Sequence, residues 1–197
     1  MNLSPEVLLS AYAQGVFPMA HEDGRIHWYS PDPRAILPLD RLHVSRSLRR
    51  VIHHGPFTIR IDSDFPAVIR ACAAPAAGRE ETWISKEIVA AYIELHRLGF
   101  AHSVEAWLGD ELAGGLYGVS LRGLFAGESM FSRRRDASKV ALYHLVRRLR
   151  ERGFRLLDVQ FLTDHLARLG AMEIPRWQYR ELLREALAVE AQFGERE

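Results

Sequence analysis

Cysteine is nearly absent from the chain, because Cys72 is the only one among 197 residues. A single cysteine excludes an intrachain disulfide and is typical of a reducing compartment, so we expect a cytoplasmic location. The first residues show no basic segment followed by an apolar one, and we therefore expect no secretion signal. Cys72 lies in an apolar, helix-like stretch, which favours a buried structural thiol over a nucleophile.

Long hydrophobic runs are also missing, although 48% of the residues are hydrophobic and 26% are charged. The longest apolar runs, such as residues 7–9, are far too short to cross a bilayer, so no membrane partner is expected. The composition supports a packed globular core, and the length suits one full domain with a small appendage.

An excess of charge of one sign is lacking too, since the formal net charge is only +1. This argues against a protein that coats nucleic acid. Arginines nevertheless cluster at residues 46–50, 133–135 and 147–152. A solvated helix face or loop explains any one cluster, whereas three of them on a nearly neutral chain indicate a partner that carries phosphate groups.

The hydrophobic periodicity predicts an α+β domain over residues 39–197, preceded by an N-terminal helical arm over residues 1–38. The arm has a helix capped by Ser4 and ended by Gly15, then an irregular, proline-rich stretch over 17–38. Strands are predicted at 57–61, 101–108, 111–121, 124–131 and 154–159, and helices at 45–55, 64–73, 85–98, 137–152, 163–170 and 177–189.

The long helix between the last two predicted strands sets the topology. A crossover of that length normally joins parallel neighbours, whereas the earlier strands are joined by tight turns. An antiparallel meander with one parallel step at its end matches the acetyl-CoA-dependent N-acetyltransferases (the GNAT fold). We therefore expect an acetyltransferase-like mixed sheet flanked by helices.

Two carboxylates and an amide converge on one edge of that sheet. Glu128 lies in an otherwise apolar strand, while Asp158 and Gln160 lie two residues apart and point to the same side. Ligands collect at the carboxyl ends of parallel strands beside a change of direction, where these residues fall. An arginine or backbone amides pairing with each buried carboxylate is one interpretation. Two carboxylates on adjacent parallel strands favour a functional site.

Glycine is missing between Phe131 and Glu151, where the long helix begins with three arginines. Free amides and arginines at a helix N-terminus favour a phosphate group. N-acetyltransferases carry a glycine-rich loop for the coenzyme at this turn, and its absence argues against acetyl-CoA. No zinc-type spacing of histidines and cysteines is present. Asp164-His165 suggests part of a catalytic triad, but no serine lies in a nucleophile-elbow motif, so His165 is interpreted as a helix-surface or structural residue.

The arm contributes Trp28 and Tyr29 immediately before a proline-fixed turn. Adjacent aromatic rings can stack on a nucleic-acid base. Packing that holds the arm against the domain explains them as well, and both interpretations stay open.

Short motifs spread over nearly the whole chain carry a resemblance to one family. They are Tyr12-x-x-Gly15-x-Phe17-Pro18, residues 28–34, 127–132, 136–139, 158–160 and 163–165, Gly170-Ala171 and residues 173–176. In this order they resemble the leucyl/phenylalanyl-tRNA–protein transferases. The resemblance implies transfer of an aminoacyl group from a tRNA ester to the α-amine of a protein beginning with Arg or Lys, which marks that protein for N-end rule degradation.

The resemblance also implies partners and residue roles. The partners are aminoacyl-tRNA, through its 3′ end and acceptor stem, and the acceptor proteins; no cofactor or metal is used. The catalytic pair falls on Asp158 and Gln160, and the pocket glutamate on Glu128. The remaining substrate-binding positions are an apolar slot of Leu116, Phe125, Met130, Leu145 and Leu157, adenosine contacts near Tyr12, Trp28 and Tyr29, and Ser132 in the motif over 127–132. Met19 stands where some members have Trp.

Two other functions fit parts of the sequence. The order of elements alone suits a conventional N-acetyltransferase, against which the missing glycine loop counts. The basic clusters and the aromatic arm suit a tRNA or peptide binder that keeps the fold without catalysis. The slot residues also have an alternative, as ordinary hydrophobic core.

Overall fold

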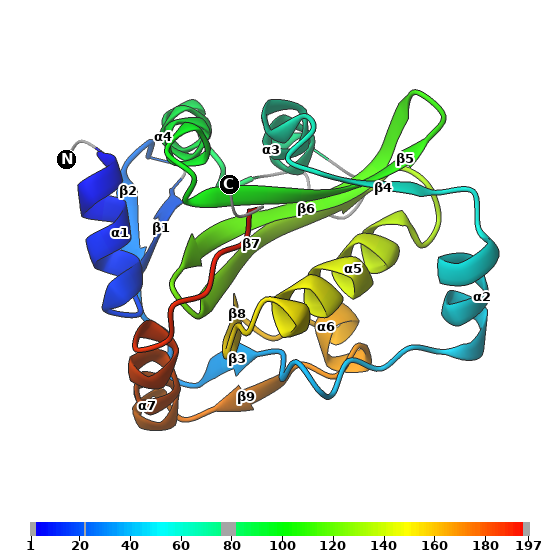
Figure 1. The fold of residues 1–197 in the computed structure, drawn as a ribbon. Helices are drawn as coiled ribbons and strands as arrows, with labels where there is room; N and C mark the ends of the chain where they lie inside the picture. Colours follow the sequence, from blue (N-terminus) through cyan, green and yellow to red (C-terminus); the bar gives the residue numbers. More distant parts are fainter. Residues whose placement is uncertain (1–2, 22, 76–81, 195–197) are drawn as a thin grey trace.

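The computed structural model describes residues 3–21, 23–75 and 82–194. A seven-stranded mixed sheet forms its centre, in the order β4-β5-β6-β7-β8-β3-β9, and a two-stranded hairpin, β1–β2, lies beside it (Figure 1). The strands are β1 (Phe17–Ala20), β2 (Ile26–Tyr29), β3 (Arg34–Ile36), β4 (Thr58–Ile61), β5 (Ala101–Leu108), β6 (Glu111–Leu121), β7 (Leu124–Ser132), β8 (Leu156–Gln160) and β9 (Met172–Ile174). All neighbours in the sheet are antiparallel except β7 and β8.

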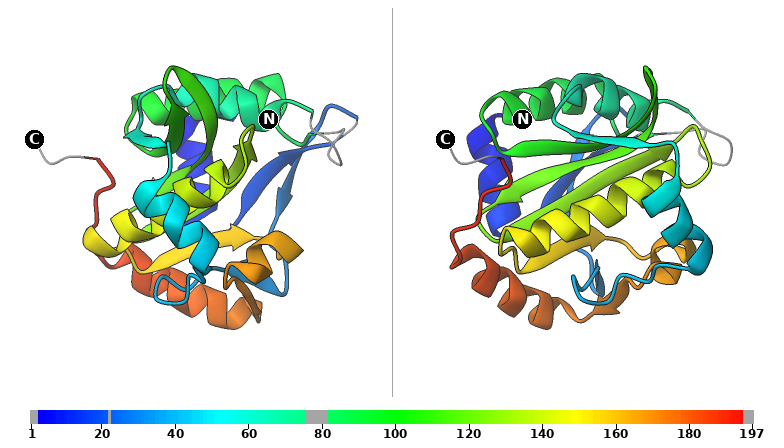
Figure 2. Two further views of the ribbon diagram at one scale, coloured as in Figure 1. Left: turned by 90° about the vertical axis from the view of Figure 1, so that its right-hand side faces the viewer. Right: turned by 45° about the vertical axis from the view of Figure 1, so that its right-hand side comes forward.

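Helices cover both faces of the sheet. In Figures 1 and 2, α3 and α4 pack on one face and the long α5 packs on the other, while α1 and α7 lie together at one end. The helices are α1 (Pro5–Ala13), α2 (Arg46–His54), α3 (Phe65–Ala73), α4 (Lys86–Arg97), α5 (Ala137–Glu151), α6 (Asp164–Arg168) and α7 (Arg176–Leu187). The predicted α+β class, the antiparallel meander and its one parallel step are confirmed.

Local sequence signals explain where these helices begin. The side chains of Ser4, Asp64, Ser85 and Thr163 each accept a hydrogen bond from a backbone N–H in the first turn of α1, α3, α4 and α6. Such caps satisfy amides that have no partner inside the helix. Burial then selects the faces: the apolar stripe of α5 is buried against the sheet, with Leu145 only 1% exposed.

The stretch over residues 17–38, predicted to be irregular, instead contains β1, β2 and β3. β3 enters the central sheet, where Ala35 pairs with Gln160 and Ile36 pairs with Asp158. These strands have only three or four residues each and lie among prolines, so no alternating pattern marks them in the sequence. β9, which has three residues, is not predicted for the same reason. Residues 34–36 of the predicted arm thus belong to the sheet, and the division at residue 38 stays a prediction.

Membrane spans and metal clusters have no counterpart in the described parts of the chain. None of the helices there has the length and hydrophobicity that a bilayer span requires. Nor do the described residues include a group of three or more His, Cys, Asp or Glu side chains that could hold a metal ion.

Candidate functional site

The site forms where β7 and β8 separate. The two strands pair in parallel only over Leu124–Ala126 and Leu156–Asp158. On its other side β7 is irregular: Tyr117 pairs with Ser129 and Gly118 with Gly127, so Glu128 has no partner residue on β6. A bulge of this kind redirects a side chain, and bulges are common beside active sites. Glu128 is therefore placed at the opening between the strands.

A glycine opposite the bulge permits this close packing. A Cβ atom on Gly118 would lie 2.3 Å from the carbonyl oxygen of Ala126 and 2.4 Å from the ring of Phe125. Real Cβ atoms do not approach backbone that closely. A larger residue at this position would displace β7 and with it Glu128.

The Glu128 carboxylate is buried but retains unused hydrogen-bonding capacity. Its Oε1 accepts from the Tyr12 hydroxyl at 2.7 Å and from the Gln160 amide at 2.8 Å. Among the described residues, the one donor to its Oε2 is the Tyr92 hydroxyl, at a long distance of 3.4 Å, and this hydroxyl is also hydrogen-bonded to the Tyr12 hydroxyl. Oε2 is thus the less satisfied of the two carboxylate oxygens.

Burial raises the pKa of Glu128 to about 7, because desolvation outweighs the hydrogen bonds from Tyr12 and Gln160 that favour its ionised form. Burial and the nearby Glu128 charge raise the pKa values of Tyr12 and Tyr92 well above normal, so both hydroxyls remain protonated donors. A carboxyl group that titrates near neutral pH suits general acid–base chemistry.

Asp158, in contrast, is paired on every side. Arg34 donates to it twice, from Nε to Oδ1 at 2.9 Å and from Nη2 to Oδ2 at 2.6 Å, and both side chains are 1% exposed. The Tyr179 hydroxyl donates to Oδ2 at 2.8 Å, and the Gln160 backbone N–H donates to Oδ1 at 2.9 Å. Four donors fill the acceptor sites of a carboxylate. The interpretation of this residue as a buried carboxylate satisfied by an arginine is the one the geometry favours.

Gln160 joins the two carboxylates. Its φ of 66° places it in the left-handed region, which is uncommon for a residue other than glycine. Its backbone N–H is held by Asp158 while its side-chain amide reaches Glu128. Among the described residues, nothing donates a hydrogen bond to the side-chain oxygen of Gln160, which leaves that oxygen able to accept one from a ligand.

A cavity of about 220 Å³ is lined by Glu128 and by other residues of β6, β7, β8, α5 and α6. Four of the five predicted slot residues line it: Leu116, Met130, Leu145 and Leu157. Phe125 is not among the lining residues; it is fully buried, with its ring centroid 5.2 Å from that of Phe193. The cavity is therefore a largely apolar slot with a buried carboxyl group in its lining.

Sequence comparison identifies the family. The family described as leucyl/phenylalanyl-tRNA protein transferase matches residues 36–184, and the N-terminal domain of the same family matches residues 1–32. The chain belongs to the leucyl/phenylalanyl-tRNA protein transferase family. This confirms the resemblance that the motifs indicate.

Close relatives in this family match over almost their whole length. The leucyl/phenylalanyl-tRNA–protein transferase of Herpetosiphon aurantiacus is 59% identical over 193 residues, covering 98% of both chains. That of Rubrobacter xylanophilus is 58% identical over 195 residues, covering 98% of this chain and 100% of the relative. That of Rhodospirillum rubrum is 56% identical, covering 98% and 92%.

Among solved structures, the chain is similar to L-PGS from Bacillus licheniformis. The identity is 14% and the TM-score 0.45, over 83% of this chain and 55% of that one.

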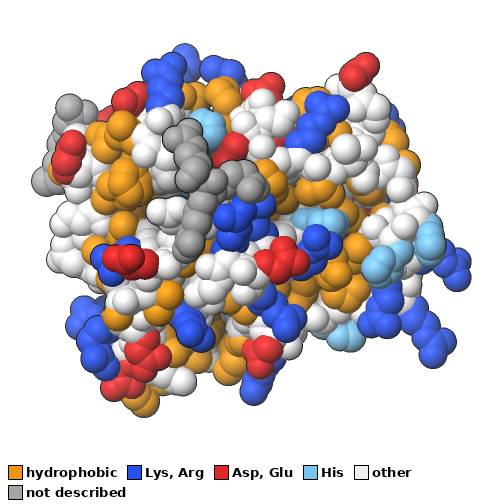
Figure 3. Space-filling view, in the orientation of Figure 1, with side chains coloured by type: hydrophobic (Ala, Val, Ile, Leu, Met, Phe, Trp, Pro, Cys, Tyr) orange, Lys and Arg blue, Asp and Glu red, His pale blue; other side chains and the backbone are white. Residues whose placement is uncertain are grey.

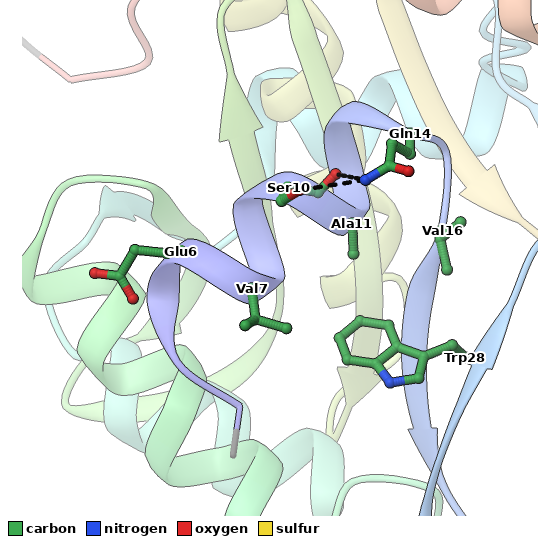
Figure 4. A pocket seen from close by; sticks show the side chains of 7 residues that line it. All are labelled: Glu6, Val7, Ser10, Ala11, Gln14, Val16 and Trp28. Atoms are coloured by element: carbon green, nitrogen blue, oxygen red, sulfur yellow. Dashed lines mark hydrogen bonds between the residues drawn. The ribbon is translucent and has the colours of Figure 1, made fainter. Parts of the chain in front are cut away.

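The family's aromatic positions fall in two different places. Tyr12 contacts Glu128 from α1, as described above. Trp28 instead lies in a shallow hollow between α1 and β2, with Val7, Ala11 and Gln14 (Figure 4). Tyr29, on the opposite side of the strand, stacks on Phe17 and hydrogen-bonds to His21. Neither Trp28 nor Tyr29 lines the slot.

At the start of α5, polar side chains that could bind a phosphate group are instead paired within the protein. Ser132 is exposed; its hydroxyl donates to the carbonyl of Arg134 and accepts from the N–H of Ser138, so it shapes the turn rather than the slot. Arg134 is paired with Glu111, and Lys139 with Asp136.

Several residues that build the site are not predicted from the sequence. Arg34 and Tyr179 lie far from Asp158 in the chain, and nothing in their local patterns marks them as its partners. Tyr92 lies inside the helix predicted over 85–98, and no motif singles it out. Thr163 and His165 line the slot from α6, and burial, with Lys139 and Arg168 nearby, lowers the pKa of His165. The motif over 163–165 is the one signal that marks these last two.

Proposed function

We propose that this protein moves leucine or phenylalanine from an aminoacyl-tRNA to the α-amine of proteins that begin with Arg or Lys, marking them for degradation in the cytoplasm. One observation carries the proposal: in a member of this transferase family, a largely apolar slot has in its lining a buried carboxyl group whose pKa is about 7. The antiparallel meander with one parallel step supports an acetyltransferase-like fold, adapted to a tRNA ester in place of acetyl-CoA.

The reaction needs little beyond alignment and one proton acceptor. The acceptor α-amine attacks the ester carbonyl carbon, a C–N bond forms, and the C–O bond to the tRNA ribose breaks. The amine's proton passes to Oε2 of Glu128 and then to the departing ribose oxygen. The side-chain oxygen of Gln160 accepts a second N–H of the amine and orients it. Holding both substrates in line supplies much of the rate.

Asp158 acts in this scheme by placing Gln160, not by taking the proton. Its four acceptor sites are filled, two of them by the adjacent Arg34 guanidinium. A proton moved to Asp158 would have to disrupt a buried ion pair, which is costly. The observation that supports Glu128 instead is its raised pKa and its open Oε2.

Replacing Leu145 by Phe should change the choice of donor. The larger ring shortens the slot, and overpacking a filled site costs about 1–3 kcal/mol, so transfer of Phe should fall more than transfer of Leu. The measurement is the ratio of the two transfer rates. Leu149→Phe is a matched control, because Leu149 is buried on the same helix and does not line the slot. Equal ratios in the parent and Leu145→Phe would mean that the slot does not receive the donor side chain.

The tRNA acceptor stem fits best over α2. Figure 3 shows Lys, Arg and His side chains gathered over that helix, which carries Arg46, Arg49, Arg50, His53 and His54. No acidic partner of its arginines appears among the described residues. A phosphate backbone is the ligand that such a surface attracts.

Replacing Arg46, Arg49 and Arg50 together by Ala should weaken tRNA binding. The slope of log affinity against log salt should fall by about one for each phosphate contact removed. Filter binding of charged tRNA over a salt series measures this. Arg97→Ala, which removes a 72% exposed arginine on α4, is the control and should leave the slope unchanged. A triple variant with the parent slope would remove α2 from the proposed interface.

The activity itself is tested with purified protein, radiolabelled Leu-tRNA and a protein that begins with Arg. Label in the acceptor supports the transferase, and its absence contradicts it. Calorimetry with acetyl-CoA tests the N-acetyltransferase alternative, for which micromolar binding would be required. A non-catalytic binder predicts that Glu128→Gln leaves all activities unchanged.

A further inference from the structure

The Arg34 guanidinium is enclosed more completely than a simple ion pair requires. Its carbon lies 4.7 Å from the ring centroid of Phe17 and 4.5 Å from that of Tyr179. Its edge makes the two bonds to Asp158, and Nη1 donates to the carbonyl oxygen of Gly15 at 2.9 Å. Arg34 therefore bridges the end of α1, strand β1, strand β8 and helix α7.

Two chains of contacts lead from Arg34 to Glu128. Along β8, Arg34 orients Asp158, whose Oδ1 holds the backbone N–H of Gln160, and the Gln160 amide donates to Oε1 of Glu128. Through Gly15, Arg34 holds the end of the helix that carries Tyr12, which donates to the same oxygen. Both donors to Oε1 of Glu128 are thus tied to one guanidinium.

We propose that Arg34 is a positioning residue for the transfer reaction: it fixes the left-handed backbone of Gln160 through Asp158, and the end of α1 through Gly15, so that Glu128 faces the acceptor amine. The proposal rests on the transferase function given above. Arg34 itself touches neither substrate.

A purely stabilising role explains the arrangement poorly. A buried ion pair contributes little net stability, because desolvation offsets its attraction, and apolar replacements are often as stable. The pair instead fixes the orientation of the Asp158 carboxylate. The planar guanidinium binds a carboxylate with two parallel hydrogen bonds in one orientation, and a lysine ammonium does not reproduce this geometry. The left-handed Gln160 is a backbone conformation that needs such support.

The test compares Arg34→Lys with the parent at saturating donor and acceptor. The charge remains, so the protein should fold, but Asp158 loses its bidentate partner. We expect kcat to fall about 100-fold with both KM values nearly unchanged, because a small misplacement of the reacting groups affects the chemical step. Tyr179→Phe keeps the stacked ring and removes one donor to Asp158, so kcat should fall several-fold.

Arg60→Lys provides the matched control. Arg60 also stacks on an aromatic ring, with its guanidinium 4.6 Å from the centroid of Trp107, but on β4, away from Glu128. Its kcat should equal that of the parent. In Arg34→Ala, added methylguanidinium should restore kcat about 10-fold or more if positioning is what was lost. Rescue of Arg34→Ala by methylguanidinium supports the proposal. If Arg34→Ala does not fold, the loss of kcat in Arg34→Lys supports it instead.

Two results would overturn the inference. One is a folded Arg34→Lys protein with the parent kcat; the other is a loss confined to KM or to melting temperature. These results can be told apart from a failure of the proposed transferase function. If that function is wrong, the parent transfers no amino acid at all. If the parent is active and Arg34→Lys is equally active, only the positioning role is contradicted.

Discussion

Replacing Glu128 by Gln should lower kcat by about a hundred- to ten-thousand-fold, the range that a positioned proton acceptor typically contributes. Glutamine keeps the size of the side chain and can still accept the hydrogen bonds of Tyr12 and Gln160 with its oxygen. It cannot take the amine's proton. Steady-state transfer of leucine to an Arg-initiated peptide measures the effect.

The pH profile separates loss of the base from loss of binding. In the parent, kcat/KM for the acceptor should depend on two groups that must lose a proton: Glu128, with a pKa of about 7, and the acceptor α-amine, near about 8. On a log scale the acid limb should rise with a slope of about two, and in Glu128→Gln with a slope of about one. Equal slopes in the two proteins would show that Glu128 does not take the proton.

Stability supplies the control for the same variant. The folded-state pKa of Glu128, about 7, lies above the value of 4.5 that a solvent-exposed glutamate has. The folded state therefore holds this proton more tightly, and the associated stability, about 3 kcal/mol, is present below pH 4.5 and lost as pH rises through 7. Glutamine does not ionise, so at pH 8 Glu128→Gln should melt no lower than the parent. A much lower melting temperature would attribute the lost activity to unfolding.

Replacing Asp158 by Asn should lower the free energy of unfolding by about 3–5 kcal/mol, as breaking one side of a buried ion pair does. The variant leaves the Arg34 charge without a counter-ion, and the amide nitrogen of the new side chain would face a guanidinium N–H. Urea denaturation measures the change. Glu111→Gln is the control, because it breaks an exposed pair with Arg134 and should have a much smaller effect.

A double variant distinguishes stability from positioning in this pair. Arg34→Met combined with Asp158→Leu removes both charges and fills the space with apolar atoms, so it should be more stable than Asp158→Asn. Its transfer activity should still be low, because no carboxylate holds Gln160. A double variant as active as the parent would contradict the role given to Asp158.

Much of the fold can be predicted from local signals. Capping residues such as Ser85 and Thr163 mark helix starts, alternating apolar residues mark the long strands, and the length of α5 predicts the parallel step. The position of the site also follows, since Glu128, Asp158 and Gln160 converge at the place where a parallel pair of strands ends. These inferences depend on patterns within one element or between neighbours.

What escapes prediction depends on contacts between distant segments. Asp158 is 124 residues from Arg34 in the chain, and no local pattern predicts the hydrogen bonds between them. The sequence therefore does not indicate that Asp158 is fully paired while Glu128 keeps an oxygen with free hydrogen-bonding capacity. The bulge that re-aims Glu128 arises from the register of β6 and β7, which an apolar strand pattern does not specify. Phe125 belongs to the same apolar strand as Met130, but its ring packs on Phe193, in the segment that follows α7, and does not line the slot.

The most direct test of the central claim is mass spectrometry of a peptide that begins with Arg, incubated with this protein and tRNA charged with Leu, Phe or Lys. We predict that the mass of one leucine or phenylalanine residue is added at the α-amine. Lysine should not be added, because the largely apolar slot would desolvate its charge, and an N-acetylated copy of the peptide should stay unmodified. An unmodified Arg-initiated peptide with all three donors, or an equal addition of lysine, would contradict it.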